Sequence, residues 1–189
     1  MSNMTTAFYS AEELSNFRFG GVGQGVRISR KSSIYSAESI YFGNNVRIDD
    51  FCILSGPIKI GSHVHIAAYT ALYGGGGITL CDFCNLSSRV SIYSVSDDYS
   101  GETMTNPTIP EEFKIVDRAP VVLGRHVIVG SGTVVLPGVV IGEGSAIGAL
   151  SLVNKEIEPW GIYAGIPVRK INDRKQNLLK LEAEYFLRK

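Results

Sequence analysis

The sequence of 189 residues predicts an all-β fold, a parallel β-helix built as a hexapeptide solenoid. Three observations predict it: a six-residue repeat of an aliphatic side chain, two interruptions after which the repeat resumes, and an amphipathic segment at each end. A period of six fits neither the 3.6 residues of a helical turn nor the two of an alternating strand. Three hexapeptides complete one triangular coil of a solenoid, so the repeat indicates this architecture.

The repeat puts an aliphatic residue at the inward position of each unit, usually followed by Gly or another small residue. The inward positions are Phe42, Ile48, Leu54, Ile60, Ile66, Leu72, Leu80, Leu86, Ile92, Leu123, Val129, Ile141, Ile147 and Val153. The small residues are expected at tight corners, where a larger side chain would collide with the chain. About fourteen units predict four to five coils.

Two interruptions divide the repeat. The unit after Leu72 is eight residues long and contains the glycines at 74–77, and the repeat is absent from Ser96 to Pro120. A solenoid accommodates such insertions as loops at a corner, and these loops often build a binding face. We therefore expect a protruding loop at 96–120 that shapes a site, with a purely decorative loop as the alternative.

The ends of the chain are expected to cap the stack. We predict an N-terminal cap at 1–21 with a short helix at 11–17, a β-helix domain at 22–171, and a C-terminal α-helix at 172–189. Such caps cover the unpaired backbone of the first and last coils.

Composition and charge narrow the classes of function. The chain is 44% hydrophobic, and its 18 acidic and 18 basic side chains balance, which argues against nucleic acid as a partner. No apolar run is long enough for a membrane span, and Met1 to Asn16 lacks the features of a signal peptide, so we expect a cytoplasmic protein. Cys52, Cys81 and Cys84 form no zinc-type pattern of two pairs, and we expect small buried side chains instead.

Several segments together resemble a known family. They are the repeat with its insertion, the run from Val135 to Gly142, Ile147-Gly148-Ala149, and the run from Tyr163 to Arg169. Over residues 22–174 the chain resembles the left-handed β-helix hexapeptide acyltransferases, and within them the galactoside, maltose and xenobiotic O-acetyltransferases. The resemblance implies a homotrimer with acetyl-CoA bound between two solenoids, an acceptor near the loop, and no metal.

The predicted function is therefore acetyl-CoA-dependent O-acetylation of a sugar, for surface-polysaccharide biosynthesis. The alternative is N-acetylation of a nucleotide-linked amino sugar, and a non-catalytic scaffold is a second alternative. The fold also serves zinc carbonic anhydrases, but the three histidines lack the spacing that a shared metal needs.

The resemblance also implies which residues meet acetyl-CoA. Small side chains line the groove for the pantetheine arm, and polar or basic ones meet the nucleotide end and its phosphates. By position these residues are Ser131, Gly148, Ala149, Asn154, Lys155 and Arg169.

The catalytic positions depart from the family pattern. The loop histidine of the family falls on Asp97, and its companion asparagine falls on Ala67. We expect His65 to act as general base, with Asp97 or Asp98 orienting its ring or binding the acceptor. Two alternatives remain open: an acceptor amine that needs little activation, and aspartates that only cap turns of the loop.

The acceptor is expected to contact Tyr93, Tyr99 and His126, and His126 is the second candidate for the base, before His63. The loop mixes tyrosines with several carboxylates, which suits a polyhydroxylated sugar and argues mildly against a nucleotide phosphate lying along it.

Overall fold

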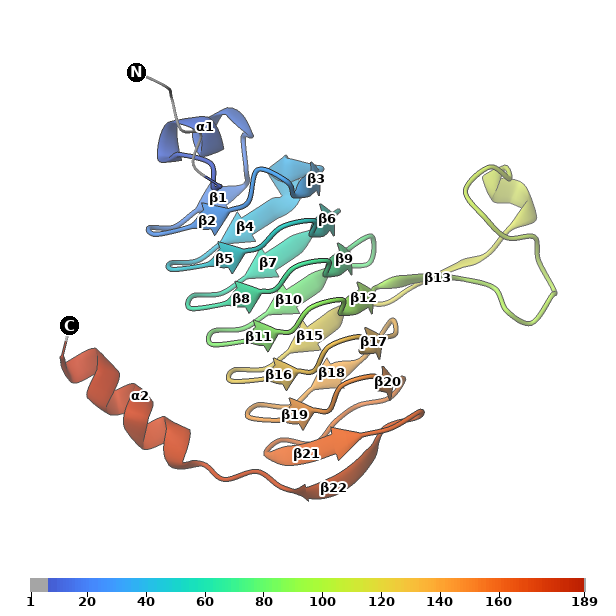
Figure 1. Cartoon of the computed structure of the whole chain (residues 1–189). Coiled ribbons are helices and arrows are strands. Elements are labelled where there is room, and N and C mark those ends of the chain that lie inside the picture. The colour runs from blue at the N-terminus through green and yellow to red at the C-terminus, as the bar shows by residue number, and fades with distance from the viewer. Residues whose placement is uncertain (1–6, 189) are drawn as a thin grey trace.

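The computed structural model describes residues 7–188 and confirms a left-handed parallel β-helix, with about seven turns stacked into a triangular prism (Figure 1). The prediction of four to five coils was too low because the stack begins earlier than the clear repeat. Ile28 and Ile34 already belong to the first coil, and Tyr163 belongs to the last. The 3-10 helix η1 (Ala37–Ser39) interrupts the first coil and hides its period.

Three sheets form the walls of the prism, and their strands are hydrogen-bonded in parallel register. Sheet 1 contains β1 (Gly21–Val22), β4 (Ile40–Phe42), β7 (Ile58–Ile60), β10 (Ile78–Leu80), β15 (Val121–Leu123) and β18 (Val140–Ile141). Sheet 2 contains β2 (Arg27–Ile28), β5 (Arg47–Ile48), β8 (His65–Ile66), β11 (Asn85–Leu86), β16 (Ile128–Val129), β19 (Ala146–Ile147), β21 (Gly161–Ala164) and the antiparallel β22 (Arg169–Asp173). Sheet 3 contains β3 (Ser33–Tyr35), β6 (Ile53–Ser55), β9 (Ala71–Tyr73), β12 (Ser91–Tyr93), β17 (Val134–Val135) and β20 (Leu152–Val153).

The core is a column of aliphatic side chains inside the prism. The inward residues predicted from the repeat, such as Ile48, Leu72 and Leu86, are fully buried. The small residues beside them are required sterically: a Cβ on Gly130 would lie 2.4 Å from the backbone nitrogen of Ala149 in the next coil. Adjacent coils therefore stack at their corners only because glycine stands there.

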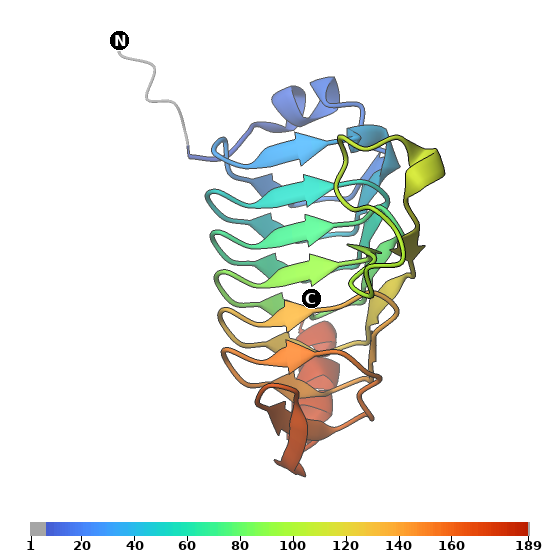
Figure 2. The same cartoon turned by 90° about the vertical axis from the view of Figure 1, so that its right-hand side faces the viewer.

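The predicted loop is a hairpin that projects away from the prism (Figure 1), and in Figure 2 it points toward the viewer. β13 (Val95–Asp97) pairs antiparallel with β14 (Val116–Arg118), and the tip carries the 3-10 helix η2 (Glu111–Phe113). The longer unit after Leu72 makes room for the hairpin base, because a Cβ on Gly76 would lie 2.3 Å from the carbonyl oxygen of Ser94. The two interruptions in the sequence therefore belong to one structural feature.

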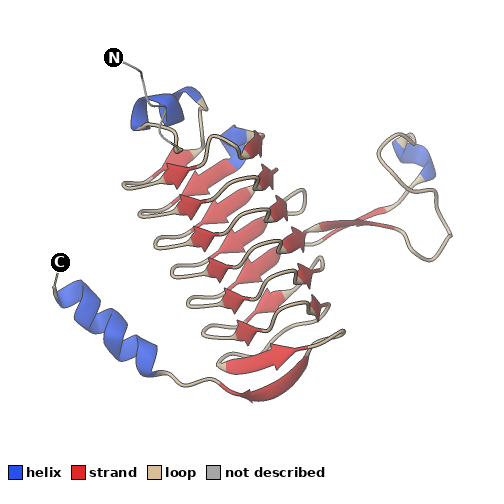
Figure 3. Ribbon diagram, in the orientation of Figure 1, coloured by secondary structure: helices blue, strands red, loops and turns tan. Residues whose placement is uncertain are grey.

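Both ends of the stack are covered (Figure 3). Helix α1 (Ala11–Asn16) begins with a capping box between Ser10 and Glu13. The helix expected over 172–189 begins later, as α2 (Asn177–Leu187), because the preceding residues form β22. β22 pairs with β21 and so covers backbone groups that the last coil would otherwise leave unpaired.

Two of the three cysteines are buried, as expected, whereas Cys81 is only partly buried. Cys52 and Cys84 lie in the core, and burial raises the pKa of their thiols to about 11 and about 12. Among residues 7–188, no helix has the length and apolar character needed to cross a membrane.

Candidate active site

The outer face of sheet 2 carries the candidate site. Side chains that flank the buried residue of each strand point outward, and the register aligns them in two columns along the prism. The first column contains Arg27, Arg47, His65, Asn85, Ile128, Ala146 and Ile162. The second column contains Asp49, Ala67, Ser87, Gly130, Gly148 and Ala164. The face is thus polar in its N-terminal coils, whereas in its C-terminal coils both columns contain only small or apolar residues. We call these two regions the polar part and the smooth part.

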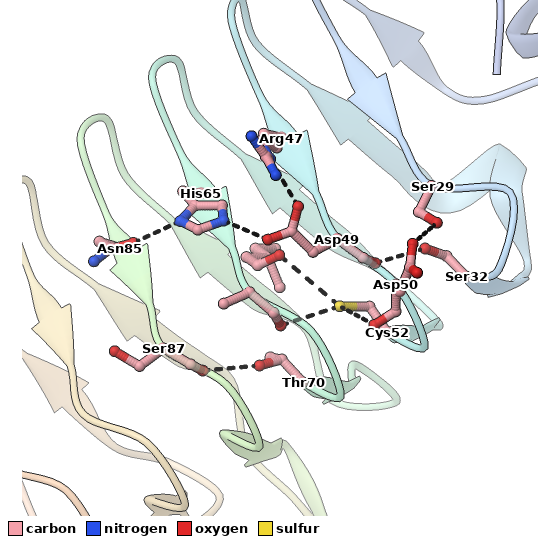
Figure 4. A network of polar contacts seen from close by, with 12 residues as sticks. Ser29, Ser32, Arg47, Asp49, Asp50, Cys52, His65, Thr70, Asn85 and Ser87 are labelled. Carbon is pink, nitrogen blue, oxygen red and sulfur yellow. Dashed lines mark hydrogen bonds and ion pairs between the residues drawn. The ribbon is translucent and has the colours of Figure 1, made fainter. Parts of the chain in front are cut away.

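The polar part holds a chain of contacts that spans three coils (Figure 4). Nε2 of His65 lies 2.8 Å from Oδ2 of Asp49, and Nδ1 lies 3.1 Å from Oδ1 of Asn85. Arg47 donates from Nε to Oδ1 of Asp49 at 2.7 Å. Both ring nitrogens of His65 are therefore in contact with oxygen atoms of its own chain.

The Asp49 carboxylate is the electrostatic centre of this chain. Its side chain is 20% exposed, and this partial burial alone would raise its pKa. The hydrogen bonds and charges of His65 and Arg47 outweigh burial, and the pKa of Asp49 falls below its ordinary value. Asp49, rather than Asp97 or Asp98, is the carboxylate that orients the His65 ring.

The smooth part brings together several of the residues predicted to meet acyl-CoA. Gly148 and Ala149 follow β19, and Ser131 occupies the same corner one coil earlier, where its carbonyl accepts from the backbone of Leu150 at 2.8 Å. Arg169 reaches the same sheet because it pairs with Ala164. Asn154 and Lys155 are exposed after β20, at the corner between sheets 3 and 1, and do not lie on this face.

The two hairpin aspartates differ in their contacts. The Asp98 carboxylate accepts hydrogen bonds from the side chain and backbone of Ser100 and from Thr103, which hold its pKa well below the ordinary range. Asp98 therefore caps a turn of the loop, as the alternative interpretation had it. Asp97 is exposed, and among residues 7–188 its side chain has no hydrogen-bond partner.

The hairpin also contains a hollow of about 680 Å³ beside Asp97. Tyr99 lines this hollow and is 95% exposed, so its ring is available to a ligand. Tyr93 lies at the hairpin base, where its ring stacks on Tyr73 with centroids 5.0 Å apart.

The other histidines lie away from these groups, at the corner between sheets 1 and 2. His126 is 9% exposed and lies 2.8 Å from the carboxylate of Glu182 in α2, and its ring stacks on Phe83. His63 stacks on the other side of Phe83. This corner anchors α2. The sequence predicted that His126 lies with Tyr93 and Tyr99 at the acceptor, but within one chain the structure does not bring these three residues together. No three His, Cys, Asp or Glu side chains within 7–188 come close enough together to form a metal site.

Comparisons with known proteins identify the relatives of the chain. The family model for the bacterial transferase hexapeptide (six repeats) matches residues 120–155. A dTDP-4-amino-4,6-dideoxy-D-glucose acyltransferase from Escherichia coli is 44% identical over 95% of both chains. AntD, an N-acyltransferase from Bacillus cereus, has been solved with dTDP-4-amino-4,6-dideoxyglucose and coenzyme A; it is 51% identical, covers 98% of this chain and 100% of its own, and superposes with a TM-score of 0.96.

More distant structures share the architecture. A hexapeptide-repeat acetyltransferase from Vibrio cholerae is 19% identical over 92% of this chain and 84% of its own, with a TM-score of 0.62. At this identity the likeness shows the fold alone.

These relatives correct the predicted reaction. O-acetyl transfer to a sugar was the main expectation, and it is wrong, because AntD transfers an acyl group to nitrogen and is similar over the whole chain. The hexapeptide acyltransferase class was right, whereas the galactoside and maltose branch is not supported. The chain is an enzyme, an acyltransferase.

Sequence reasoning missed three polar residues of the face: Asp49, Asn85 and Ser87. The signal was present, because they lie 16, 20 and 22 positions from His65, within about one coil before or after it. In a solenoid such residues are neighbours in space.

Proposed function

The chain belongs to the hexapeptide-repeat acyltransferases, and from this premise we propose that it transfers an acyl group from acyl-CoA to the amine of a dTDP-linked amino sugar. The observation that carries the proposal is the similarity to AntD, which extends over 98% of this chain and includes complexes with the amino sugar nucleotide and coenzyme A. Acetyl-CoA was the expected donor, but one AntD complex contains 3-hydroxybutyryl-CoA, so both acyl groups are candidates.

The AntD variants point to the acceptor site in this chain. The replaced residues in those structures are a serine and an aspartate ten positions further along that sequence. Ser87 and Asp97 have the same spacing here. Ser88 and Asp98 share it too, but the Asp98 carboxylate is already used by the turn of its own loop. We therefore propose that Ser87 and Asp97 contact the acceptor amine.

Acyl transfer to an amine needs little help from a general base. An amine of ordinary basicity is partly neutral near pH 7 to 8, so its lone pair can attack the thioester carbonyl directly. The C–N bond forms, the C–S bond breaks, and coenzyme A leaves as a thiolate that the proton lost by the amine neutralises. The Asp97 carboxylate accepts a hydrogen bond from the amine and orients it, and the Ser87 hydroxyl is a second polar contact.

We further propose that the enzyme is a homotrimer. Asp97 ends β13, in the hairpin that projects from the prism (Figure 1), and within residues 7–188 no contact joins it to Ser87. In this proposal the Ser87 that lies near Asp97 belongs to another copy of the chain. The corner between sheets 2 and 3 exposes the stacked rings of Phe51 and Tyr69, followed along the prism by Arg89 over the Tyr69 ring, and such an aromatic and basic edge suits burial between copies. A cytoplasmic location, where acyl-CoA is made, and a role in surface-polysaccharide assembly are part of the same proposal.

Mass spectrometry of the product tests the reaction. The enzyme is incubated with dTDP-4-amino-4,6-dideoxyglucose and either acetyl-CoA or 3-hydroxybutyryl-CoA, and the matched control is the dTDP-sugar with a hydroxyl group in place of the amine. The proposal predicts the N-acylated sugar with release of one coenzyme A, and little product from the hydroxyl control. Equal acylation of the hydroxyl control, or no acylation of the amine, would refute it.

A further inference from the structure

The polar part of sheet 2 begins, in its first two coils, with a pair of arginines. Arg27 and Arg47 lie opposite each other in the parallel register of β2 and β5, and both are exposed. Neighbouring strands are about 4.8 Å apart, and like charges that lie directly opposite each other destabilise the pairing of two strands. The other described residues of the first column include no lysine or arginine, so the positive charge of this column is concentrated in two coils.

This pair carries more charge than its surroundings neutralise. Nε of Arg47 donates to Asp49 at 2.7 Å, but within residues 7–188 the two terminal NH2 groups of Arg47 have no acceptor (Figure 4). In the same part of the chain, Arg27 has no carboxylate partner. One carboxylate therefore accompanies two guanidinium groups, and its other oxygen is in contact with His65. The excess of positive charge favours an anion at this end of the face.

An aromatic ring from outside the repeat lies against both guanidinium groups. Phe8 forms an isolated antiparallel bridge with Ser29, which brings its ring to the first coil. The centroid of this ring is 4.4 Å from the guanidinium carbon of Arg27 and 5.5 Å from that of Arg47. Attraction between a cation and an aromatic ring at these distances offsets part of the repulsion between the two charges. The two guanidinium groups are therefore held near each other before a ligand binds.

The distance from the pair to Ser87 matches the length of a sugar nucleotide. Ser87 lies two coils after Arg47 and three coils after Arg27, which is about 10 and 14 Å at the spacing of neighbouring strands. With covalent bonds of about 1.5 Å, the two phosphates of a 4-amino sugar nucleotide lie roughly 7 to 10 Å from the amine. The long side chain of arginine spans the remainder. An acceptor whose amine is at Ser87 thus brings its diphosphate to the guanidinium groups when its nucleotide extends toward the first coils.

The other directions suit a diphosphate less well. Toward the C-terminal coils the face is the smooth part, where we place acyl-CoA. Along the hairpin, the hollow beside Tyr99 is lined by the carboxylates of Asp97 and Asp98 and by no lysine or arginine among the described residues. Carboxylates repel phosphate, so the nucleotide is favoured on the arginine side of Ser87.

We propose that Arg27 and Arg47 bind the diphosphate of the nucleotide-linked acceptor, and that Phe8 is a positioning residue for both guanidinium groups. The proposal rests on the proposed function in its choice of a nucleotide-linked sugar. Each guanidinium group presents paired N–H donors that match two phosphate oxygens, whereas the ammonium group of lysine acts as a point charge. Specificity for the nucleotide thus lies in the first two coils, apart from recognition of the amine.

Calorimetric titration with dTDP tests the two arginines without the reaction. Arg27→Met and Arg47→Met keep an apolar stem and remove the charge. Lys59→Met removes an exposed charge from sheet 1 and is the matched control. Loss of one charge-assisted contact predicts that the Kd for dTDP rises about tenfold in each arginine variant, and by less than about twofold in the control. Arginine variants that bind dTDP as tightly as wild type would overturn the proposal.

A conservative variant and steady-state kinetics separate phosphate binding from general support of the fold. Arg27→Lys keeps the charge and should bind dTDP within about threefold of wild type. In Arg27→Met the KM for the dTDP-amino sugar should rise about tenfold, while the KM for acyl-CoA and kcat stay unchanged. An equal rise in both KM values, or a loss in Arg27→Lys as large as in Arg27→Met, would contradict the role of the charge.

The role of Phe8 is tested through the arginines. Phe8→Leu keeps an apolar side chain and removes the aromatic ring, and should raise the Kd for dTDP about threefold in the wild-type background. In a chain that already carries Arg27→Met and Arg47→Met, the same substitution should have no further effect, because it acts only through the guanidinium groups. An undiminished loss in that background would show that Phe8 does not act through the arginines.

These measurements distinguish this proposal from the proposed function. Acylation of the amino sugar, together with unchanged dTDP affinity in the arginine variants, would overturn the diphosphate site alone. Weakened dTDP binding in these variants, without acylation of the amino sugar by wild type, would place the failure in the proposed reaction. A wild-type enzyme that binds no dTDP would overturn both.

Discussion

The two halves of sheet 2 have the same backbone and opposite surfaces. In the N-terminal coils the outward positions hold Arg47, His65 and Asn85, joined by hydrogen bonds, whereas the corresponding positions after the hairpin are Ile128 and Ala146. The parallel register continues unbroken across the change. In our proposal the two halves bind different substrates, and the periodic fold separates them by outward residues alone, since the inward ones are fixed by the core.

The boundary between the halves coincides with the hairpin. The hairpin leaves the stack after β12 and returns at β15, between the coil of Asn85 and the coil of Ile128. In our proposal the amine of the acceptor meets the thioester of acyl-CoA between these two coils. The insertion thus stands where a polar acceptor end and a smooth acyl-CoA end adjoin.

The largest expected effect comes from filling the smooth half. Ala149→Trp adds an exposed side chain at a corner without entering the core, and should lower kcat/KM for acyl-CoA at least about 100-fold by blocking the groove. The sharpest control is Ala68→Trp, at the same corner two coils before the hairpin region, which should raise the acceptor KM instead. If both variants impair the same substrate, the division of the face is wrong.

A smaller loss is expected at the hairpin. Asp97→Asn removes the charge from a carboxylate that has no hydrogen-bond partner in the described part of the chain. It should lower kcat/KM for the amino sugar about 30-fold, the worth of a charge-assisted hydrogen bond. Asp98→Asn is the matched control and should keep kcat within about threefold, because that residue holds only the loop. A larger effect at Asp98 than at Asp97 would reverse the assignment.

The smallest effect concerns stability in the polar half. Because contacts with His65 and Arg47 lower the pKa of Asp49, its carboxylate stabilises the fold at pH values above the ordinary carboxyl range. Wild type should exceed Asp49→Asn by about 1 kcal/mol in unfolding free energy at pH 7. The difference should shrink as the pH falls below about 4, toward the lowered pKa. Urea unfolding at a series of pH values measures it, and a difference that grows in acid would contradict the account.

The fold was predictable because the repeat acts through the core and corners of every coil. Each coil needs an aliphatic residue inside and a small residue at its corner. Leu54 and Leu86 are examples of the first and Gly43 of the second, so the pattern is visible in the sequence. The number of coils was underestimated where η1 displaced the period, and the start of α2 was missed because β22 forms only against β21. Such pairings depend on a partner strand and leave no period in the sequence.

The site was predictable only where it follows the repeat. The phase of the repeat placed Gly148 and Ala149 directly after a strand of sheet 2, where the structure has them. The contacts of His65 could not be predicted from its own position, because they are made with Asp49 and Asn85 in the coils before and after. The acceptor could not be predicted from the sequence either. In our proposal Asp97 recognises its amine together with residues of another copy of the chain, and no repeat in the sequence indicates such a contact.

Complementation between two disabled variants tests the central claim most directly. Ala149→Trp and Asp97→Asn chains are unfolded together, refolded and assayed with acyl-CoA and the dTDP-amino sugar, and each variant refolded alone is the control. If one copy supplies the sheet 2 face and its neighbour supplies the hairpin, random mixing in a trimer restores about a quarter of the sites. Activity that stays at the level of the separate variants would show that hairpin and face act within one chain, and would contradict the account.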